Sequence, residues 1–494
     1  MSYPFKNKDQ QFLLDFRHLT EKTQTVFDEQ AAEEFIEEWK DLAKQAVLTA
    51  NLSSLKLLLN LLRPLVAEHP QWQINLSRYS GRLAWIEGDY IRAARLFEEQ
   101  QGLAKQQNNL IAIVKARLDL ADVRLVQVAP AQVELLLQQS LALTQEHQFH
   151  LLHVQTLNRL GRFHQLQQHY ELSQQYLEQA LALVQQPIQE EQGQVVSEVE
   201  LALEEAFGLQ WQGANYAALR QWEQAELVLS QSLTICQQHH DVLGMLETML
   251  KLGAVYHETE RYSSALFCFE GSLAVCEQLH YLPALLPAYY YKARTHLALG
   301  SYQEALIPAQ RAVEIGLETD QLEWLGQAFL VLGRVYHALK QYRLALICHL
   351  RIAQLYQPGN SNSEWIGLLM GAGDFLLDAK KYSNYWEEAL ECYRRAVNLV
   401  EVHQQLEYLA PMLGKMARAF TRLKGRGGLE DAARCFRLQL QLAGDLDSVA
   451  LPPSVAVAMR VEALTGLQCC MALRVNESPN DSKAFGTAGK LAIV

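Results

Sequence analysis

The chain has 494 residues, of which 49% are hydrophobic, and its 43 basic and 55 acidic residues give a formal net charge of −12. This apolar content is enough for a buried core, which excludes a disordered chain, and the acidic balance disfavours a general nucleic-acid or anionic-membrane binder. No secretory signal and no run of about 18 apolar residues is visible, so we expect a cytoplasmic protein without a membrane span.

Residues 1–70 have helical patterns at about 10–20, 29–51 and 53–68, and Ser53 or Ser54 is the expected N-cap of the third. The end of a helical array needs one polar face, so we expect this region to be a helical cap or a degenerate repeat. A separate N-terminal effector bundle is the alternative. Leu, Ala, Gln and Glu dominate the whole chain, and these helix formers predict an all-α protein.

A two-helix motif is clearest in residues 252–276. Gly253 is followed by Tyr256, and Tyr262 precedes Ala265, with Phe269 one helical turn further on. A glycine lets two helices approach closely, and a small alanine avoids pushing the pair apart. The motif therefore predicts a tightly packed helical hairpin.

The same arrangement recurs along most of the chain. A small residue occupies the alanine position at a spacing of 40 residues in most steps. These positions are Ala93, Val133, Ser173, Ala225, Ala265, Ala305, Ala345, Ala389 and Ala432. An aromatic residue precedes most second helices, at Tyr90, Tyr170, Trp222, Tyr262, Tyr302 and Tyr342. We therefore expect nine two-helix units.

The L-G-x-x-Y … A-x-x-x-F order of residues 252–269 resembles the tetratricopeptide repeat (TPR), and the resemblance extends over roughly residues 71–445. The spacing exceeds that of the common TPR by about 9 Å of helix per repeat, which is similar to the long-helix subtype. The resemblance implies an all-α, TPR-type α-solenoid: a right-handed superhelix of helix-turn-helix repeats with helical caps. It also implies a concave groove that binds a partner.

The one large break in the register divides the expected array. Residues 187–197 contain Pro187 and Gly193 without apolar periodicity, which predicts a loop or hinge between repeats 1–3 (71–186) and repeats 4–9 (198–445). A tolerated surface insertion is the alternative. Residues 425–428 predict a long flexible turn within the ninth repeat. We expect a capping helix within 446–474 and a flexible tail at 475–494.

The cysteine and histidine patterns favour packing over chemistry. Four cysteines share one repeat position, which indicates small buried residues rather than disulfides or a metal site: Cys268, Cys348, Cys392 and Cys435. His147, His150 and His153 have a spacing that could serve zinc on a helix, but they fall at a repeat boundary, where we expect a polar loop. No catalytic motif is recognisable, so we expect no enzyme activity, no cofactor and no bound metal.

In the first helix of each repeat, the positions that should face the groove combine arginine with aromatic residues. The candidate partner-binding residues are Arg78, Tyr79, Arg82, Arg159, Arg162, Trp211, Lys251, His257, Tyr290, Tyr291, Arg294, Arg334 and His337. Local positive charge on an acidic protein predicts an acidic or amphipathic segment of another protein, with no direct nucleic-acid partner. The alternative is that these arginines pair with glutamates of neighbouring repeats.

Two functions are compatible with this groove. The first is a scaffold or adaptor that holds a segment of a partner protein. The second is a peptide- or ligand-gated regulator, in which the bound segment tightens the superhelix and repositions the N-terminal helices. An appended DNA-binding or catalytic domain would favour the second function, and none is recognisable, which favours the scaffold.

Overall fold

The computed structural model describes residues 6–23, 29–49, 51–67, 69–126, 130–186, 197–279, 281–319, 322–356, 364–378, 385–403, 408–422, 426–444 and 453–476. In these ranges the regular elements are 22 α-helices and one 3-10 helix, which confirms the all-α class. The chain divides into two compact bodies, which we call the N-terminal body (Met1–Gln321) and the C-terminal body (Leu322–Val494).

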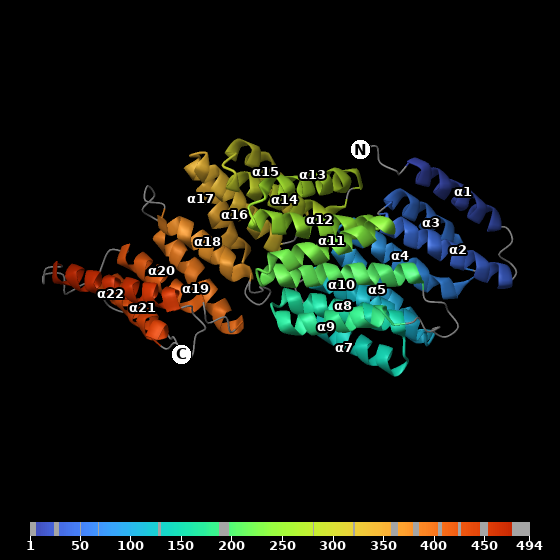
Figure 1. Ribbon diagram of the computed structural model, residues 1–494, viewed down its shortest axis with the longest axis horizontal. Coiled ribbons are helices and arrows are strands. Elements are labelled where there is room, and N and C mark those ends of the chain that lie inside the picture. Colours follow the sequence, from blue (N-terminus) through green and yellow to red (C-terminus); the bar gives the residue numbers. More distant parts are fainter. Residues whose placement is uncertain are drawn as a thin grey trace. The chain divides into compact units, whose positions relative to one another are not determined.

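The N-terminal body starts with three helices and a 3-10 turn, followed by six helical hairpins (Figure 1). The leading elements are α1 (Lys6–Lys22), α2 (Glu29–Leu48), α3 (Leu52–Leu65) and η1 (Pro70–Trp72). The first helices of the hairpins are α4 (Gln73–Ile86), α6 (Leu110–Val126), α8 (His150–Leu166), α10 (Glu198–Ala218), α12 (Val242–Glu258) and α14 (Leu282–Ala298). The second helices are α5 (Tyr90–Gln106), α7 (Pro130–Glu146), α9 (Tyr170–Val184), α11 (Trp222–Gln238), α13 (Tyr262–Leu279) and α15 (Tyr302–Thr319).

The 40-residue spacing follows from one kind of turn. Helix α12 has 17 residues, and α13 begins after a three-residue turn. In this turn Glu260 has φ 60°, the Arg261 amide donates to the Tyr256 carbonyl at 2.8 Å, and the Glu260 amide donates to the His257 carbonyl at 3.0 Å. This left-handed C-cap closes the helix with backbone hydrogen bonds. Gln148, Gln168, Arg220, His240 and Lys340 have the same positive φ between other helices.

The predicted repeat positions are the core of each hairpin. All nine positions of the alanine set, from Ala93 to Ala432, are 0% exposed. A Cβ atom on Gly253 would lie only 2.5 Å from Cε1 of Phe269, and one on Gly213 only 2.5 Å from Cγ of Leu229. The first helix therefore needs glycine there to accept the large side chain of the second. The aromatic set begins α5, α9, α11, α13, α15 and α17, as predicted.

The helices of residues 1–70 pack on the first repeat. Phe35, Trp39 and Leu58 form one buried cluster with Trp72 and Tyr79. The predicted N-cap of α3 was wrong, because the helix begins at Leu52, so that Asn51 precedes it and its Oδ1 atom accepts the Ser54 amide at 3.0 Å. An asparagine just outside the first turn competes well for this role.

The insertion after α9 does not interrupt the packing of repeats three and four. Asn158 of α8 donates to the Glu204 carbonyl of α10 at 2.9 Å, and Asn215 of α10 donates to Ser173 Oγ of α9 at 2.8 Å. Consecutive helices thus lie side by side through this region (Figure 1). Residues 187–196 lie outside the described residues, so the hinge stays a prediction. The division between the two compact bodies falls elsewhere in the chain, after Gln321.

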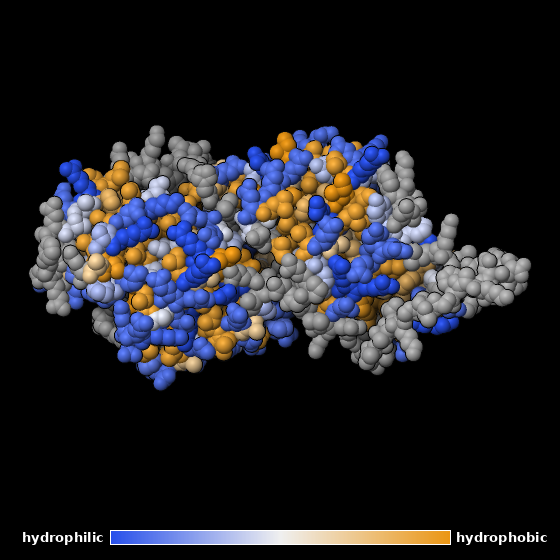
Figure 2. Space-filling view, turned by 180° about the vertical axis from the view of Figure 1, so that it is seen from behind, coloured by the Kyte–Doolittle hydropathy of each residue, from blue (hydrophilic) through white to orange (hydrophobic). Residues whose placement is uncertain are grey.

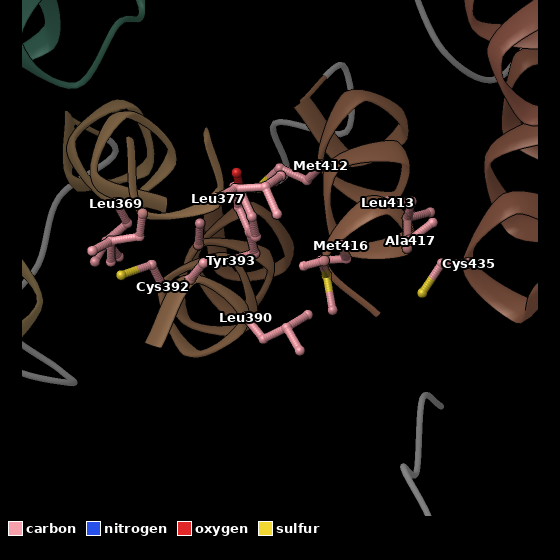
Figure 3. Close-up of a cluster of buried hydrophobic side chains, with 14 of the residues drawn as sticks. Leu369, Leu377, Leu390, Cys392, Tyr393, Met412, Leu413, Met416, Ala417 and Cys435 are labelled. Carbon is pink, nitrogen blue, oxygen red and sulfur yellow. The ribbon is translucent and has the colours of Figure 1, made fainter. Parts of the chain in front are cut away.

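The C-terminal body contains three further hairpins and a final helix. Its helices are α16 (Leu322–Ala338), α17 (Tyr342–Leu355), α18 (Glu364–Asp378), α19 (Trp386–His403), α20 (Leu409–Arg422), α21 (Arg426–Gly444) and α22 (Pro453–Asn476). Leucine, methionine, cysteine and tyrosine side chains of α18–α21 fill one core, which extends to Ala463 and Cys470 of α22 (Figure 3). The tail 477–494 lies outside the described residues.

Two predicted loops are corrected by the helix boundaries. Residues 426–428 are the first residues of α21 and not part of a turn. A glycine costs little in a first helical turn, where the amides have no helical partners in any case. His150 and His153 belong to α8 rather than to a loop, because the turn occupies residues 147–149 and ends at the buried Phe149.

Candidate partner-binding surface

Arg78 and Arg82 on α4 share one buried carboxylate. Arg78 Nε lies 3.0 Å from Asp119 Oδ2 of α6, and Arg82 Nη2 contacts Asp119 Oδ1. Asp119 is 3% exposed, and burial opposes its ionisation, but the two guanidinium groups outweigh burial and lower its pKa below the ordinary value. The pair of arginines is thus charged and already engaged within the protein.

Arg159 and Arg162 on α8, two repeats after α4, share a second carboxylate of α6 in the same way. Arg159 Nε lies 3.2 Å from Asp122 Oδ2, and Arg162 Nη1 lies 3.1 Å from Asp122 Oδ1. Glu204 of α10 adds a further acidic group beside Arg159, and burial raises the pKa of Glu204 despite this positive neighbour. Helices α4, α6, α8 and α10 therefore carry a continuous network of alternating charge.

Trp211 continues this surface on α10. Two cations lie over its indole ring, with Arg162 Cζ 5.1 Å and Lys251 Nζ 4.3 Å from the ring centroid. Both distances are typical of cation–π contacts. Burial lowers the pKa of Lys251 to about 8, against the opposing charge of Glu247. Arg162, Trp211 and Lys251 come from α8, α10 and α12, and the structure brings these three predicted residues together.

The N-terminal helices approach the same surface from the other side. Lys44 Nζ of α2 lies 3.3 Å from Glu200 Oε1 of α10. The rings of Trp85 (α4) and Tyr281 (the residue before α14) have centroids 6.0 Å apart. One apolar cluster joins α2, α3 and α4 to α12 and α14. It contains Val47, Leu52, Trp85 and Ile86 from the first group and Val242, Leu246, Leu250, Ala284 and Leu285 from the second. Within the N-terminal body, α2–α4 thus meet α10–α14, and the charged network lies where they meet.

Lys115 on α6 belongs to this network, although it is not among the partner-binding residues predicted from the sequence. Burial and the neighbouring charge of Arg78 lower its pKa to about 8, while Glu200 opposes the shift. Lys40 and Lys44 of α2 are further positive neighbours that lower this pKa. The repeat register places Lys115 on the first helix of the second repeat, but the approach of α2 could not be foreseen from that register.

Tyr79 and His257 are buried between packed helices, and Arg159 and Trp211 of the charged network are similarly buried, at 9% and 7% exposed. Tyr79 is 4% exposed and meets the Trp39 ring edge-on at a centroid distance of 5.2 Å. His257 is 9% exposed, and its Nδ1 atom lies 3.0 Å from Thr295 Oγ1. Their burial follows from α2 and α14 packing against α4 and α12, which covers these positions.

The candidates on α14 are divided between core and surface. Tyr290 is 8% exposed, and Tyr291 stacks on the core residue Phe269 with centroids 5.5 Å apart. Arg294 is half-exposed and pairs with Glu258 of α12, with Nη2 and Oε1 2.6 Å apart. Five predicted arginines thus pair with acidic residues of a neighbouring first helix: Arg78, Arg82, Arg159, Arg162 and Arg294. This agrees with the alternative prediction of pairing between repeats, although two of the three acidic residues are aspartates rather than glutamates.

Arg334 and His337 belong to α16 of the C-terminal body. Both side chains are exposed. The His337 ring meets the rings of Tyr342 and Phe375 edge-on, with centroids 5.5 Å and 5.4 Å away. These two residues are therefore assigned to the C-terminal body alone.

The second helices carry a different surface. Leu227, Phe267 and Ile307 occupy one repeat position on α11, α13 and α15 and are 60%, 69% and 68% exposed. Apolar and hydrophilic residues are interspersed over the face of the molecule drawn in Figure 2. These side chains provide an apolar alternative to the charged network as a contact surface.

The cysteines and histidines form no visible chemical centre in the part of the chain that the structure describes. Cys268, Cys348, Cys392 and Cys435 are free and buried, as predicted from their shared position, and burial raises the pKa of the Cys268 thiol to about 11. No group of three or more potential metal ligands occurs among the described residues. His153 instead lies 3.0 Å from Thr144 Oγ1.

Two family models with the description tetratricopeptide repeat match the chain, at residues 154–184 and 244–318. The second match covers repeats five and six, including the Gly253–Phe269 contact. The chain contains tetratricopeptide repeats. Its 17-residue helices and 40-residue spacing make it a long-helix form of the repeat.

Solved structures with a similar chain path include a Rap protein and a quorum sensor. A Rap protein complexed with Competence and Sporulation Factor is 17% identical, with a TM-score of 0.49, over 76% of this chain and 98% of that chain. The apo quorum sensor NprR from B. thuringiensis is 18% identical, with a TM-score of 0.46, over 76% and 99%. NprR in complex with its cognate peptide NprX is 17% identical, with a TM-score of 0.44, over 75% and 99%.

At these identities, the similarity of this chain to the solved structures is one of fold alone. No curated protein matches its sequence. Within the described residues, no helix combines the length and the apolar character needed to cross a membrane.

Proposed function

We propose that this TPR protein is a protein-interaction scaffold that binds a partner segment on the charged surface formed by α4, α6, α8, α10 and α12. The observation that carries the proposal is the placement of Arg162 and Lys251 over the indole ring of Trp211. Arginine and tryptophan are the residue types that dominate binding energy at protein interfaces. Their concentration on one surface supports recognition rather than packing alone.

The charge of the surface supports an acidic partner segment. The side chains of Arg78, Arg82 and Arg162 keep 21%, 26% and 21% of their area exposed, so an incoming carboxylate reaches them. Lys115 and Lys251 have no ion pair among the described residues and offer further positive charge. Free thiols suit a reducing compartment, which supports a cytoplasmic location.

Hydrogen exchange on a captured complex tests this function. The tagged protein is used to isolate partners from its native host, and amide protection is then compared between the free protein and the complex. Protection concentrated in α8, α10 and α12 is expected. Protection confined to α11, α13 and α15, where Leu227, Phe267 and Ile307 are exposed, would move the binding surface to the second helices.

A second candidate function, a peptide-gated regulator, is favoured by the contacts between α2–α4 and α10–α14. A ligand that binds the charged network touches the helices on both sides of these contacts, including Lys44 and Glu200. Binding would then shift the position of the N-terminal helices, because a ligand favours the arrangement to which it binds better. A ligand-dependent change in exchange at α2 and α3, away from the bound segment, distinguishes this regulator from a passive scaffold.

A further inference from the structure

Buried hydrogen-bond donors of α8, of α10 and of the residue before α14 have no acceptor among the described residues. Trp211 Nε1, Arg162 Nε and the hydroxyl of Tyr281 are buried and have no hydrogen-bond partner among the described residues. Trp211 is 7% exposed and Tyr281 is 0% exposed. Buried polar groups in folded proteins are nearly always satisfied, so these unsatisfied donors call for an acceptor.

The donors belong to one neighbourhood rather than to separate defects. Arg162 and Lys251 lie over the same Trp211 ring, at 5.1 Å and 4.3 Å from its centroid. The charges of Arg162 and Glu247 both act on Tyr281, and the same two groups act on Lys251. Helices α8, α10 and α12 therefore meet at the Trp211 ring, and Tyr281 lies within range of the Arg162 charge.

The neighbourhood of Tyr281 extends to a second indole. Trp85 of α4 has its ring centroid 6.0 Å from that of Tyr281, and its Nε1 atom is also buried without a partner among the described residues. The two indoles and the phenol provide apolar faces beside the polar atoms. Such a combination of aromatic walls and a few converging polar groups is typical of ligand sites.

The chemistry of the donors selects the ligand. Lys251, Arg162 and Trp211 can only donate hydrogen bonds. A carboxylate only accepts, and its two oxygens offer about four acceptor positions, so one such group can satisfy several of these donors. Arg162 already uses Nη1 for Asp122, which leaves Nε for the ligand.

We propose that Lys251, Arg162 and Trp211 form an anchor site for a carboxylate of a bound peptide, with Tyr281 and Trp85 flanking it. The proposal rests on the proposed function and names the group that this surface recognises. The carboxylate belongs either to the C-terminus of the peptide or to an Asp or Glu side chain. Both sources offer the same chemistry to the donors.

Three libraries of random hexapeptides separate the two sources. The first lacks acidic residues and has a free C-terminus, the second has one Glu and an amidated C-terminus, and the third lacks acidic residues and is amidated. Each library is incubated with the full-length protein, and peptides that elute with the protein in gel filtration are quantified by mass spectrometry. Retention of the first or second library at least about tenfold above the third is expected, and the stronger arm identifies the source of the carboxylate.

The variant Lys251→Met removes the ammonium group while keeping a flexible chain of similar volume. Lys105→Met, at an exposed position of α5, is the matched control. We expect Lys251→Met to reduce the retention of carboxylate peptides, relative to the library without a carboxylate, at least about tenfold. Lys105→Met should leave this ratio unchanged. Thermal unfolding of both variants checks that the fold is intact.

The outcomes separate the anchor from the wider function. Peptides retained without any preference for a carboxylate, or a preference unchanged in Lys251→Met, would overturn the anchor site and leave a peptide-binding surface in place. No retained peptide in any library would overturn the anchor site and peptide binding together.

Discussion

Lys44 of α2 and Glu200 of α10 form an ion pair, with Nζ and Oε1 3.3 Å apart, although the two helices are separated by three repeats. The pair joins the N-terminal helices to the fourth repeat. The two side chains are 43% and 35% exposed, so the pair contributes only about 0–1 kcal/mol to stability. Its effect should therefore appear in the position of α2 rather than in the unfolding midpoint.

Charge reversal tests this contact directly. In Lys44→Glu we expect faster amide exchange in α2 and little change in thermal stability, because two carboxylates then face each other. The double variant Lys44→Glu with Glu200→Lys restores opposite charges and should restore the slow exchange. Equal exchange in all three proteins would show that the ion pair does not hold α2.

Gly253 provides a test of the close helix approach in the fifth repeat. Gly253→Ala places a methyl carbon only 2.5 Å from Cε1 of Phe269. Overpacking of this kind costs about 1–3 kcal/mol. Gly102→Ala is the matched control, since nothing lies within 4 Å of its Cβ position on α5. We expect the control to be neutral or stabilising by about 0.5–1 kcal/mol, as helix propensity predicts. Urea denaturation followed by circular dichroism measures both effects.

The alanine positions provide a second test of the repeat packing. Ala265, Ala305 and Ala345 are each 0% exposed, so replacement by leucine should destabilise the protein by about 1–3 kcal/mol. Ala218→Leu, at an exposed position near the end of α10, should change the unfolding midpoint little. A shift of similar size for all four variants would contradict the assignment of these alanines to the helix interface.

Asp119 should contribute more to stability than the exposed acids of the network. Asp119→Ala leaves Arg78 and Arg82 without their shared buried carboxylate, and breaking such a pair costs about 3–5 kcal/mol. Glu258→Ala removes only the half-exposed partner of Arg294 and should cost about 0–1 kcal/mol. Equal denaturation midpoints for the two variants would show that Asp119 does not stabilise the α4–α6 contact in this way.

His349 of α17 should make the C-terminal body sensitive to acid. It is 1% exposed and stacks on Phe375 at a centroid distance of 4.0 Å, and its burial, with the charges of Arg334 and His337, lowers its pKa to about 3. The unfolded chain binds the proton at about pH 6.5, so the stability of the folded state falls as the pH is lowered from about 6.5 toward 3.

The variant His349→Leu removes this titration while keeping an apolar contact. Between pH 7 and pH 5 we expect its melting temperature to fall less than that of the unchanged protein. His147→Leu, at an exposed position in the turn before α8, is the control and should follow the unchanged protein. An identical pH dependence in all three proteins would contradict the role assigned to buried His349.

Local patterns in the sequence were sufficient to predict the hairpins. Gly253, Ala265 and Tyr262 lie at their predicted places because a glycine, a small residue and the aromatic start of a helix act within one pair of helices. Two boundaries were missed for equally local reasons. Asn51 caps α3 in place of a serine, and Arg426 begins α21, because neighbouring cap and turn residues compete closely for the same role.

The charged surface depended on the tertiary structure. The sequence placed Arg78, Arg162, Trp211 and Lys251 on first helices, but pairing with Asp119 or Asp122 depends on the rotation between successive repeats. The contact of Lys44 with Glu200 depends on that rotation summed over several repeats, and a small change in each step would separate the two residues. Hairpin formation is thus determined by neighbouring residues in the chain, whereas the surface is determined by how the hairpins stack.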